Sequence, residues 1–203
     1  MPTPLRILRA EALLGAFDWD IAHCRQVRDL ALLLFDQLRP LHGLGADERD
    51  VLNAAALLHD IGWTVSGSKH HKHSYRLIHE SKRSLTGFAP NQVELIANVA
   101  RYHRKALPSL KHEAFAALTV NEQEIVCRLA GLLRVADGLD RPHLQLVRVL
   151  ECQTEPGRIH IRVHAQAELA AHLEGANRKR DLFESVFTCS LHLEGVALPH
   201  AKD

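Results

Sequence analysis

The sequence predicts a mainly α-helical protein with a small α+β unit at its C-terminal end. Up to about residue 142, apolar residues recur every three or four positions, which is the periodicity of helices that pack on a core. Beyond that point, the segments "LVRVLECQT" and "RIHIRVHA" are rich in β-branched residues, as strands are. We therefore expect a helical bundle over residues 1–145 and a ββαβ unit over residues 146–203 that packs on it.

Length and composition are those of a compact, water-soluble protein. The chain has 203 residues, of which 46% are hydrophobic and 24% charged, and this suffices for one substantial core. Its apolar stretches are too short to cross a bilayer and its N-terminal segment lacks the features of a signal peptide, so we expect a cytoplasmic protein without a membrane partner. A formal net charge of +1 disfavours dedicated nucleic-acid binding.

The first two long helices each carry polar groups on the side that faces the core. One helix is expected over about residues 19–39, and extending its apolar row one turn upstream leads to His23. The next is expected to begin near Asp47, a good N-cap residue, and its inward row ends at His59, with Asp60 in the same last turn. These imidazole and carboxylate groups should therefore point inward.

Two later helices also have an inward apolar row that ends in a histidine or an aspartate. The helix that opens at Ala89-Pro90 has an inward row ending at His103, and the helix that opens within "TVNEQE" has one ending at Asp137. A capping box is available to the latter helix in two registers, Thr119 with Glu122 or Asn121 with Glu124.

The C-terminal unit is expected to contain two strands, one helix and a third strand. The segment Glu155-Pro156-Gly157 separates the two β-branched segments and suits a hairpin turn. The segment "AELAAHLEGANRKRDLFESVF" then predicts a single helix, and "TCSLHLEGV" predicts the last strand.

Several helices thus aim ligand-type side chains at one core, which indicates a divalent metal. A buried charge without a partner costs on the order of several kcal/mol, and a shared ion satisfies such groups together. Nitrogen and oxygen ligands without thiolate suit Mn²⁺, Fe²⁺, Co²⁺, Ni²⁺ or Zn²⁺ rather than a structural zinc site. We expect one or two divalent ions, Mg²⁺ included among the candidates.

The order of these residues resembles a known signature. His23, then His59-Asp60 within "LLHDIG", then Asp137 on a helical scaffold is similar to the motif of the HD-domain metal-dependent phosphohydrolases. The segments "HHKHSYRLI", "ANVARYHRK", "LLRVADGLDR" and "RKRDLFESVFTCSLHLEG" further resemble the C-terminal HD-type region of the exopolyphosphatase/guanosine-pentaphosphatase (Ppx/GppA) family. The resemblance covers nearly the whole chain and implies an HD-domain helical bundle that hydrolyses a nucleotide-like or oligophosphate substrate.

Two departures from related families narrow this expectation. The Ppx/GppA family hydrolyses polyphosphate in an N-terminal actin-like domain, whereas here no glycine-rich strand-to-helix loop precedes His23, so a stand-alone HD domain is expected. The alarmone hydrolases among HD proteins carry an acidic pair after the His-Asp motif, where this chain has Ile61-Gly62-Trp63-Thr64. Their substrate is therefore disfavoured.

The stretch "KHHKH" resembles the bimetallic HD phosphodiesterases, in which additional histidines hold a second metal. His71 is the first choice for that role and His70 the next, while His73 is interpreted as a helix-start residue. The expected ligands are then His23, His59, Asp60, His71, His103 and Asp137.

Metal-assisted hydrolysis of a phosphate ester or anhydride is the expected chemistry, because a bound metal lowers the pKa of water toward about 7. Asp60, as a bridging ligand, and His103, as the proton donor to the leaving oxygen, are the expected catalytic residues. Arg104, Arg141 and Lys69 are the expected substrate contacts, since guanidinium and ammonium groups bind phosphate oxygens.

An alternative is a non-catalytic HD-type module that senses nucleotide or polyphosphate or forms a homodimer, as this region does in part in the larger family. A purely structural metal is disfavoured, because closed structural sites are usually built from cysteine and the four cysteines form no Cys-x-x-Cys pair.

Overall fold

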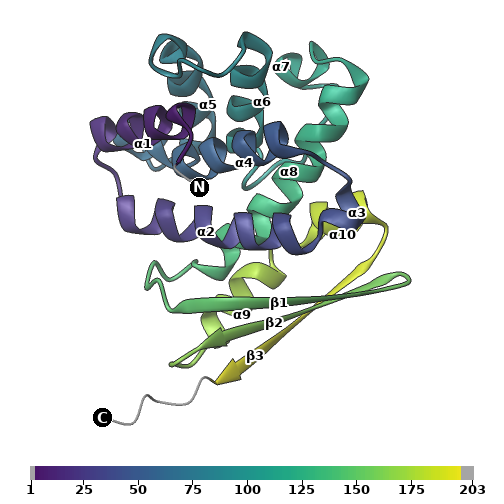
Figure 1. Ribbon diagram of the computed structural model, residues 1–203. Coiled ribbons are helices and arrows are strands. Elements are labelled where there is room, and N and C mark those ends of the chain that lie inside the picture. The colour runs from purple at the N-terminus through teal and green to yellow at the C-terminus, as the bar shows by residue number, and fades with distance from the viewer. Residues whose placement is uncertain (1–2, 198–203) are drawn as a thin grey trace.

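The computed structural model describes residues 3–197 and shows a bundle of helices with a three-stranded sheet packed against one side of it (Figure 1). A mainly helical protein with a small C-terminal sheet is thereby confirmed. The change from helices to strands falls at Val147, where the first strand begins. The outer ends of the two predicted units, residues 1–2 and 198–203, lie outside the described residues, and the division into units stays a prediction.

The helical part places one helix at its centre. Its elements are α1 (Leu5–Phe17), α2 (Ile21–Gln37), α3 (Arg39–His42), α4 (Ala46–Leu58), η1 (Ile61–Thr64), α5 (His70–Glu80), η2 (Lys82–Ser84), α6 (Pro90–Arg101), α7 (Glu113–Ala116) and α8 (Val120–Leu139). Helix α4 contacts α1, α2, α6 and α8, and its residues 50–58 are all buried. Among the described helices, none is long and apolar enough to cross a membrane.

Local interactions explain where these helices begin. The expected start of α4 at Asp47 is wrong by two residues: Gly45 is the N-cap, and its amide donates to the Glu48 side chain at 2.8 Å. Asp47 lies in the first turn instead, where a carboxylate is favourable to the helix dipole. For α8, the first of the two capping registers is confirmed, because the Thr119 amide donates to Glu122 Oε2 at 3.0 Å.

The C-terminal part forms one sheet with mixed strand directions. Strands β1 (Val147–Glu155) and β2 (Arg158–Ala165) form the expected hairpin, whose turn contains Gly157 with a φ of 70°. Strand β3 (Ser190–Ala197) pairs with β2 in parallel, because the chain crosses over through helices between them.

The single helix expected in this crossover is wrong, since the chain forms α9 (Ala170–Asn177) and α10 (Asp181–Phe187) with a break at residues 178–180. The break has a physical reason in α8. The buried guanidinium of Arg134 binds the Asp181 carboxylate at 2.8 Å and the backbone carbonyl of Lys179 at 3.3 Å, and so holds the chain in its turn.

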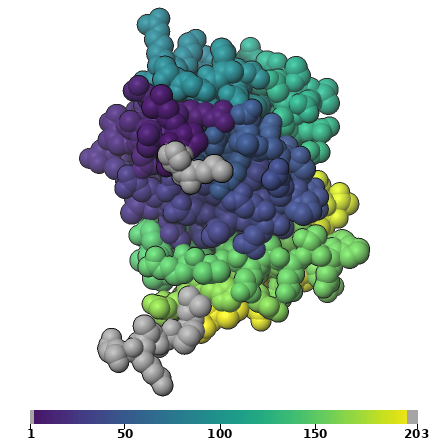
Figure 2. All heavy atoms as spheres, in the orientation of Figure 1, coloured from purple at the N-terminus to yellow at the C-terminus, as the bar shows by residue number. Residues whose placement is uncertain are grey.

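Contacts on two sides hold the C-terminal part on the bundle. The side-chain amide of Gln37 in α2 donates to the carbonyl of Leu150 at 2.7 Å and accepts from the amide of Cys152 at 2.8 Å, which covers the free edge of β1. On the other side, α9 and α10 pack against α8. The surface is accordingly continuous between α2 and the strands (Figure 2).

Candidate metal centre

Two groups of potential metal ligands lie side by side at the C-terminal end of α4. One group contains His23, His59 and Asp137, and the other contains Asp60, His70 and His103. Within each group the ligand atoms all lie within 4.8 Å of one another, and all six residues are buried. The sequence motif residues are therefore brought together in space.

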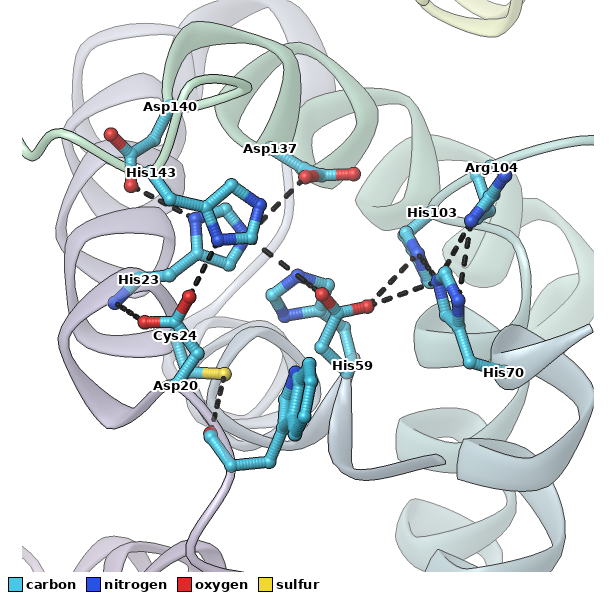
Figure 3. Close-up of polar contacts among 12 residues, drawn as sticks. Asp20, His23, Cys24, His59, His70, His103, Arg104, Asp137, Asp140 and His143 are labelled. Carbon is cyan, nitrogen blue, oxygen red and sulfur yellow. Dashed lines mark hydrogen bonds and ion pairs between the residues drawn. The ribbon is translucent and has the colours of Figure 1, made fainter. Parts of the chain in front are cut away.

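Each ligand-type side chain comes from the end of a helix, and these ends meet beside the C-terminal end of α4. His23 lies in the first turn of α2, His70 begins α5, and Asp137 lies in the last turn of α8. His59 and His103 follow the last residues of α4 and α6. Figure 3 shows these side chains converging on one region between the helices. Because helix ends meet here, few side chains from each helix are needed to build the site.

The carboxylate of Asp60 lies between the two groups. Its Oδ2 is 3.7 Å from His59 Nε2 and 3.9 Å from His23 Nε2. Its Oδ1 is 3.2 Å from His70 Nε2 and 3.4 Å from His103 Nε2. Each oxygen thus faces one group, which is the arrangement of a ligand that bridges two cations.

Hydrogen bonds at the outer ring nitrogens orient the imidazoles. The Nδ1 atoms of His59 and His103 each donate to a backbone carbonyl at 2.7 Å, that of Ala56 and that of Ala100. Because a carbonyl only accepts, Nδ1 carries the proton and Nε2 presents its lone pair to the site. His23 is oriented in the same way by Asp140, whose carboxylate lies 2.9 Å from His23 Nδ1.

Three inward atoms have no hydrogen-bond partner among the described residues. They are Nε2 of His23, Nε2 of His59 and Oδ1 of Asp60, and all are buried. Buried polar atoms without a partner are rare because they are costly, so each requires an explanation. Lone pairs of imidazole nitrogen and carboxylate oxygen that face one another fit a divalent cation.

The charge states of His59, His103 and Asp60 agree with this chemistry. Burial lowers the pKa of His59 and lowers that of His103 well below its usual value, so both rings are neutral at pH 7. Burial also opposes ionisation of Asp60, but the neighbouring His59, His70 and His103 outweigh it and lower its pKa. His23 differs: burial acts against its charged form, yet Asp137 and Asp140 raise its pKa to about 10. Without an ion this ring is therefore protonated at pH 7, and binding of a cation has to release the proton from Nε2.

A cavity of about 220 Å³ opens onto the site and is lined mainly by basic residues. Asp60 and Asp137 form part of its wall. The basic residues that line it are Arg104, Lys105, Arg141, Arg178 and Lys179. An anion with several charges would be attracted into such a cavity.

Most of the expected substrate contacts lie at this cavity, and one does not. Arg104 and Arg141 line it, as the sequence predicts for phosphate contacts. Lys69 is the exposed N-cap of α5, with a φ of 59°, and is not one of the lining residues. The expectation of Lys69 as a substrate contact is not supported by this position.

The choice between neighbouring histidines also differs from expectation. The structure places His70, not His71, with Asp60 and His103. The two side chains point apart because successive helical residues are rotated by about 100° and α5 begins at His70. The ring centroid of His71 lies 6.5 Å from that of His103, and burial with nearby positive charges lowers the pKa of His71 to about 4.

Sequence reasoning missed several residues that contact the ligands. Asp140 lies three residues after Asp137 on the same helix face, so its spacing could have revealed it. The ring of His143 stacks on that of His23 with centroids 3.7 Å apart and lies 2.6 Å from the Asp20 carboxylate. Lys179 forms an ion pair with Asp137 from the break between α9 and α10, a contact that no local pattern predicts.

Similarity to known proteins covers most of the chain. A family model described as Ppx/GppA phosphatase, domain III, matches residues 5–183. Proteins named guanosine-5'-triphosphate,3'-diphosphate pyrophosphatase from Aeromonas hydrophila and Aeromonas salmonicida are 31% and 30% identical over 128 residues, which is 63% of this chain and 25% of each relative. The protein of that name from Vibrio vulnificus is 28% identical over 173 residues, 82% of this chain and 34% of the relative. The chain thus spans a quarter to a third of the length of these curated relatives.

Proposed function

The chain belongs to the Ppx/GppA phosphatase domain III family, and we propose that it is itself a metal-dependent phosphohydrolase of the HD type. The substrate would be a phosphate ester or anhydride of a nucleotide-like or oligophosphate compound. The observation that carries the proposal is the position of Asp60, whose two carboxylate oxygens face two separate groups of ligands. The similar Aeromonas proteins are named pyrophosphatases, which supports the reaction class.

The ligand set of the proposed centre follows from the two groups. His23, His59 and Asp137 would hold one divalent ion, and His70 and His103 would hold a second, with Asp60 shared between them. His70 takes the place that the sequence suggested for His71. Such ions activate a water as nucleophile and neutralise charge on a phosphoryl group.

The residues of the chain itself bind and orient the substrate. Arg104 and Arg141 line the cavity and would bind phosphoryl oxygens through paired N–H groups. We do not propose that His103, besides binding metal, also donates a proton to the leaving oxygen. Burial lowers its pKa well below the usual value, and its one proton at neutral pH lies on Nδ1, bound to the carbonyl of Ala100.

The alternative is a non-catalytic module that binds nucleotide or polyphosphate. One observation favours it: the ion pair between Lys179 and Asp137 satisfies that carboxylate without a metal. The enzyme is preferred because this ion pair satisfies only Asp137. The inward atoms of His23, His59 and Asp60 still have no hydrogen-bond partner among the described residues.

Metal analysis and a phosphate-release screen separate these functions. Wild-type protein loaded with Mn²⁺, Co²⁺ or Ni²⁺ is expected to release phosphate from at least one class of nucleotide or oligophosphate, and His59→Ala to lose both activity and metal. His70→Ala should retain one ion of two, whereas the neighbouring His71→Ala is the matched control and should retain both. Wild-type protein that binds these compounds but releases nothing would establish the binding module.

A further inference from the structure

Lys179 and Asp137 form an ion pair at the edge of the proposed metal centre. The side chain of Lys179 is 16% exposed and that of Asp137 is 8% exposed, so both charges are largely removed from water. The ammonium contacts Oδ2 of Asp137, while Oδ1 of the same carboxylate lies 3.6 Å from His23 Nε2. One carboxylate is thus divided between a lysine and a ligand group.

The backbone of Lys179 is anchored, although its side chain lies at the cavity. Its amide donates to the carbonyl of Ala176 at 3.0 Å, and its carbonyl accepts from Arg134 at 3.3 Å. The same guanidinium binds the carbonyl of Tyr102 at 3.2 Å, next to the ligand His103. The Lys179 side chain can therefore change its rotamer without movement of the segment, and the cavity beside it gives room for that change.

We propose that Lys179 is a built-in cation that competes with a divalent ion for the carboxylate of Asp137. This inference rests on the proposed metal centre. Two positive charges at contact distance in a poorly solvated site repel strongly, so an ion at Asp137 displaces the ammonium. The displaced group remains in the basic cavity beside Arg141 and Arg178, where it adds a positive charge for phosphoryl oxygens. Without an ion, Lys179 compensates the buried charge of Asp137.

Replacement of Lys179 by methionine should produce two effects of opposite sign. Lys179→Met keeps the length of the apolar side chain and removes its charge. The affinity for Mn²⁺ or Ni²⁺, measured by isothermal titration calorimetry, should rise about tenfold or more because the competing cation is lost. The melting temperature in the presence of EDTA should fall, because the buried carboxylate of Asp137 loses its ammonium partner and keeps only the more distant His23 ring.

Lys105→Met is the matched control. Lys105 lines the same cavity, and within residues 3–197 it forms no ion pair with Asp137. This variant loses the same charge and should change metal affinity less, without the fall in melting temperature. Lys179→Gln serves where the methionine variant folds poorly, since its amide can still donate to Asp137 and its metal affinity should also rise.

Each outcome decides the inference. Equal affinities in the Lys179 and Lys105 variants, or weaker binding after loss of Lys179, would overturn it and leave the metal centre in place. If Lys179→Met binds an ion and the wild-type protein does not, the result would support the inference. Absence of binding in wild-type protein and in both Lys179 variants would reject the metal centre together with the competition.

Discussion

Asp140 determines how the His23 ring presents itself to the proposed metal. Its buried carboxylate lies 2.9 Å from His23 Nδ1, which directs Nε2 toward Asp60 and Asp137. Loss of such an outer partner typically reduces metal affinity by about 10- to 100-fold. Asp140→Asn should therefore weaken Mn²⁺ or Ni²⁺ binding by that factor in calorimetric titrations. Asp50→Asn, which removes another buried carboxylate, paired with Arg6 at 2.7 Å, should leave the affinity unchanged. Equal effects of the two changes would argue against the orientation by Asp140.

His42 should make the folded state sensitive to acid. Its Nε2 donates to the carbonyl of Phe35 at 2.8 Å and its Nδ1 accepts from the amide of Leu44 at 3.0 Å, so both nitrogens are used by the neutral ring. Burial lowers the pKa of His42 below the value of about 6.5 found in unfolded chains. The unfolded state then binds a proton first as pH falls below about 6.5, and stability is lost in that direction.

Two measurements check this dependence. The pKa of His42 in an NMR titration should lie below 6.5. The difference in unfolding free energy between pH 7.5 and pH 5.5 should shrink in His42→Asn but persist when the exposed His192 is replaced by asparagine. A difference that is unchanged in His42→Asn would assign the acid sensitivity to other groups.

At the scale of elements, the crossing of α8 and α9 depends on two glycines. A Cβ atom at Gly138 would lie 2.5 Å from the Cα atom of Ala176, and one at Gly175 would lie 2.4 Å from the carbonyl oxygen of Gly138. Backbone atoms cannot move aside as a flexible side chain can. The two helices can therefore approach this closely only because both positions are glycine. The contact also sets the distance between Asp137, next to Gly138, and the segment that carries Lys179.

Gly138→Ala should therefore destabilise the fold by about 1–3 kcal/mol, the usual cost of overpacking, and also weaken metal binding. Gly15→Ala in α1 is the control, because a Cβ there meets no atom within 4 Å and alanine should stabilise the helix by roughly 0.5–1 kcal/mol. Denaturant unfolding of both variants measures the difference. A neutral effect of Gly138→Ala would show that the two helices can separate at little cost.

At the scale of the whole molecule, the helical bundle and the sheet should unfold together. Ile161 and Val163 of β2 are buried in the same apolar cluster as the bundle residues, and Phe183 of α10 lies against Gly131 of α8. The C-terminal part therefore shares its core with the bundle. Native-state hydrogen exchange should give the amides of β2 and α8 the same free energy of opening. Exchange of β2 through a separate opening of lower free energy would show that residues 146–197 form an independent unit.

The cavity also belongs to the molecule as a whole. Arg104 and Lys105 reach it from the bundle, whereas Arg178 and Lys179 reach it from the break between α9 and α10. The C-terminal part therefore does more than cover the bundle, because it supplies positive charge to the wall of the proposed active site.

The sequence by itself determined the helical class and most of the candidate ligands. Apolar rows at helical spacing follow from the requirement that each helix bury one face, and a polar residue on such a row must then lie inside. The spacing of apolar residues along each helix predicted that four side chains point inward, and all four are buried: His23, His59, His103 and Asp137. Capping chemistry likewise predicted the starts of α6 and α8, since it depends on residues close in sequence.

Only the tertiary structure decided the features that depend on distant residues. Because α5 begins at His70, the direction of its first side chains decides that His70 and not His71 faces Asp60 and His103. A repeating apolar pattern cannot predict that direction at the very start of a helix. Arg134 breaks the helix expected after β2 because its guanidinium, 45 and 47 positions away from its partners, binds Lys179 and Asp181. The pairing of Lys179 with Asp137 follows from that break. Local patterns carry the preference of a segment for a helix or strand, whereas the counter-ion of a buried charge is chosen by the packing of elements remote in sequence.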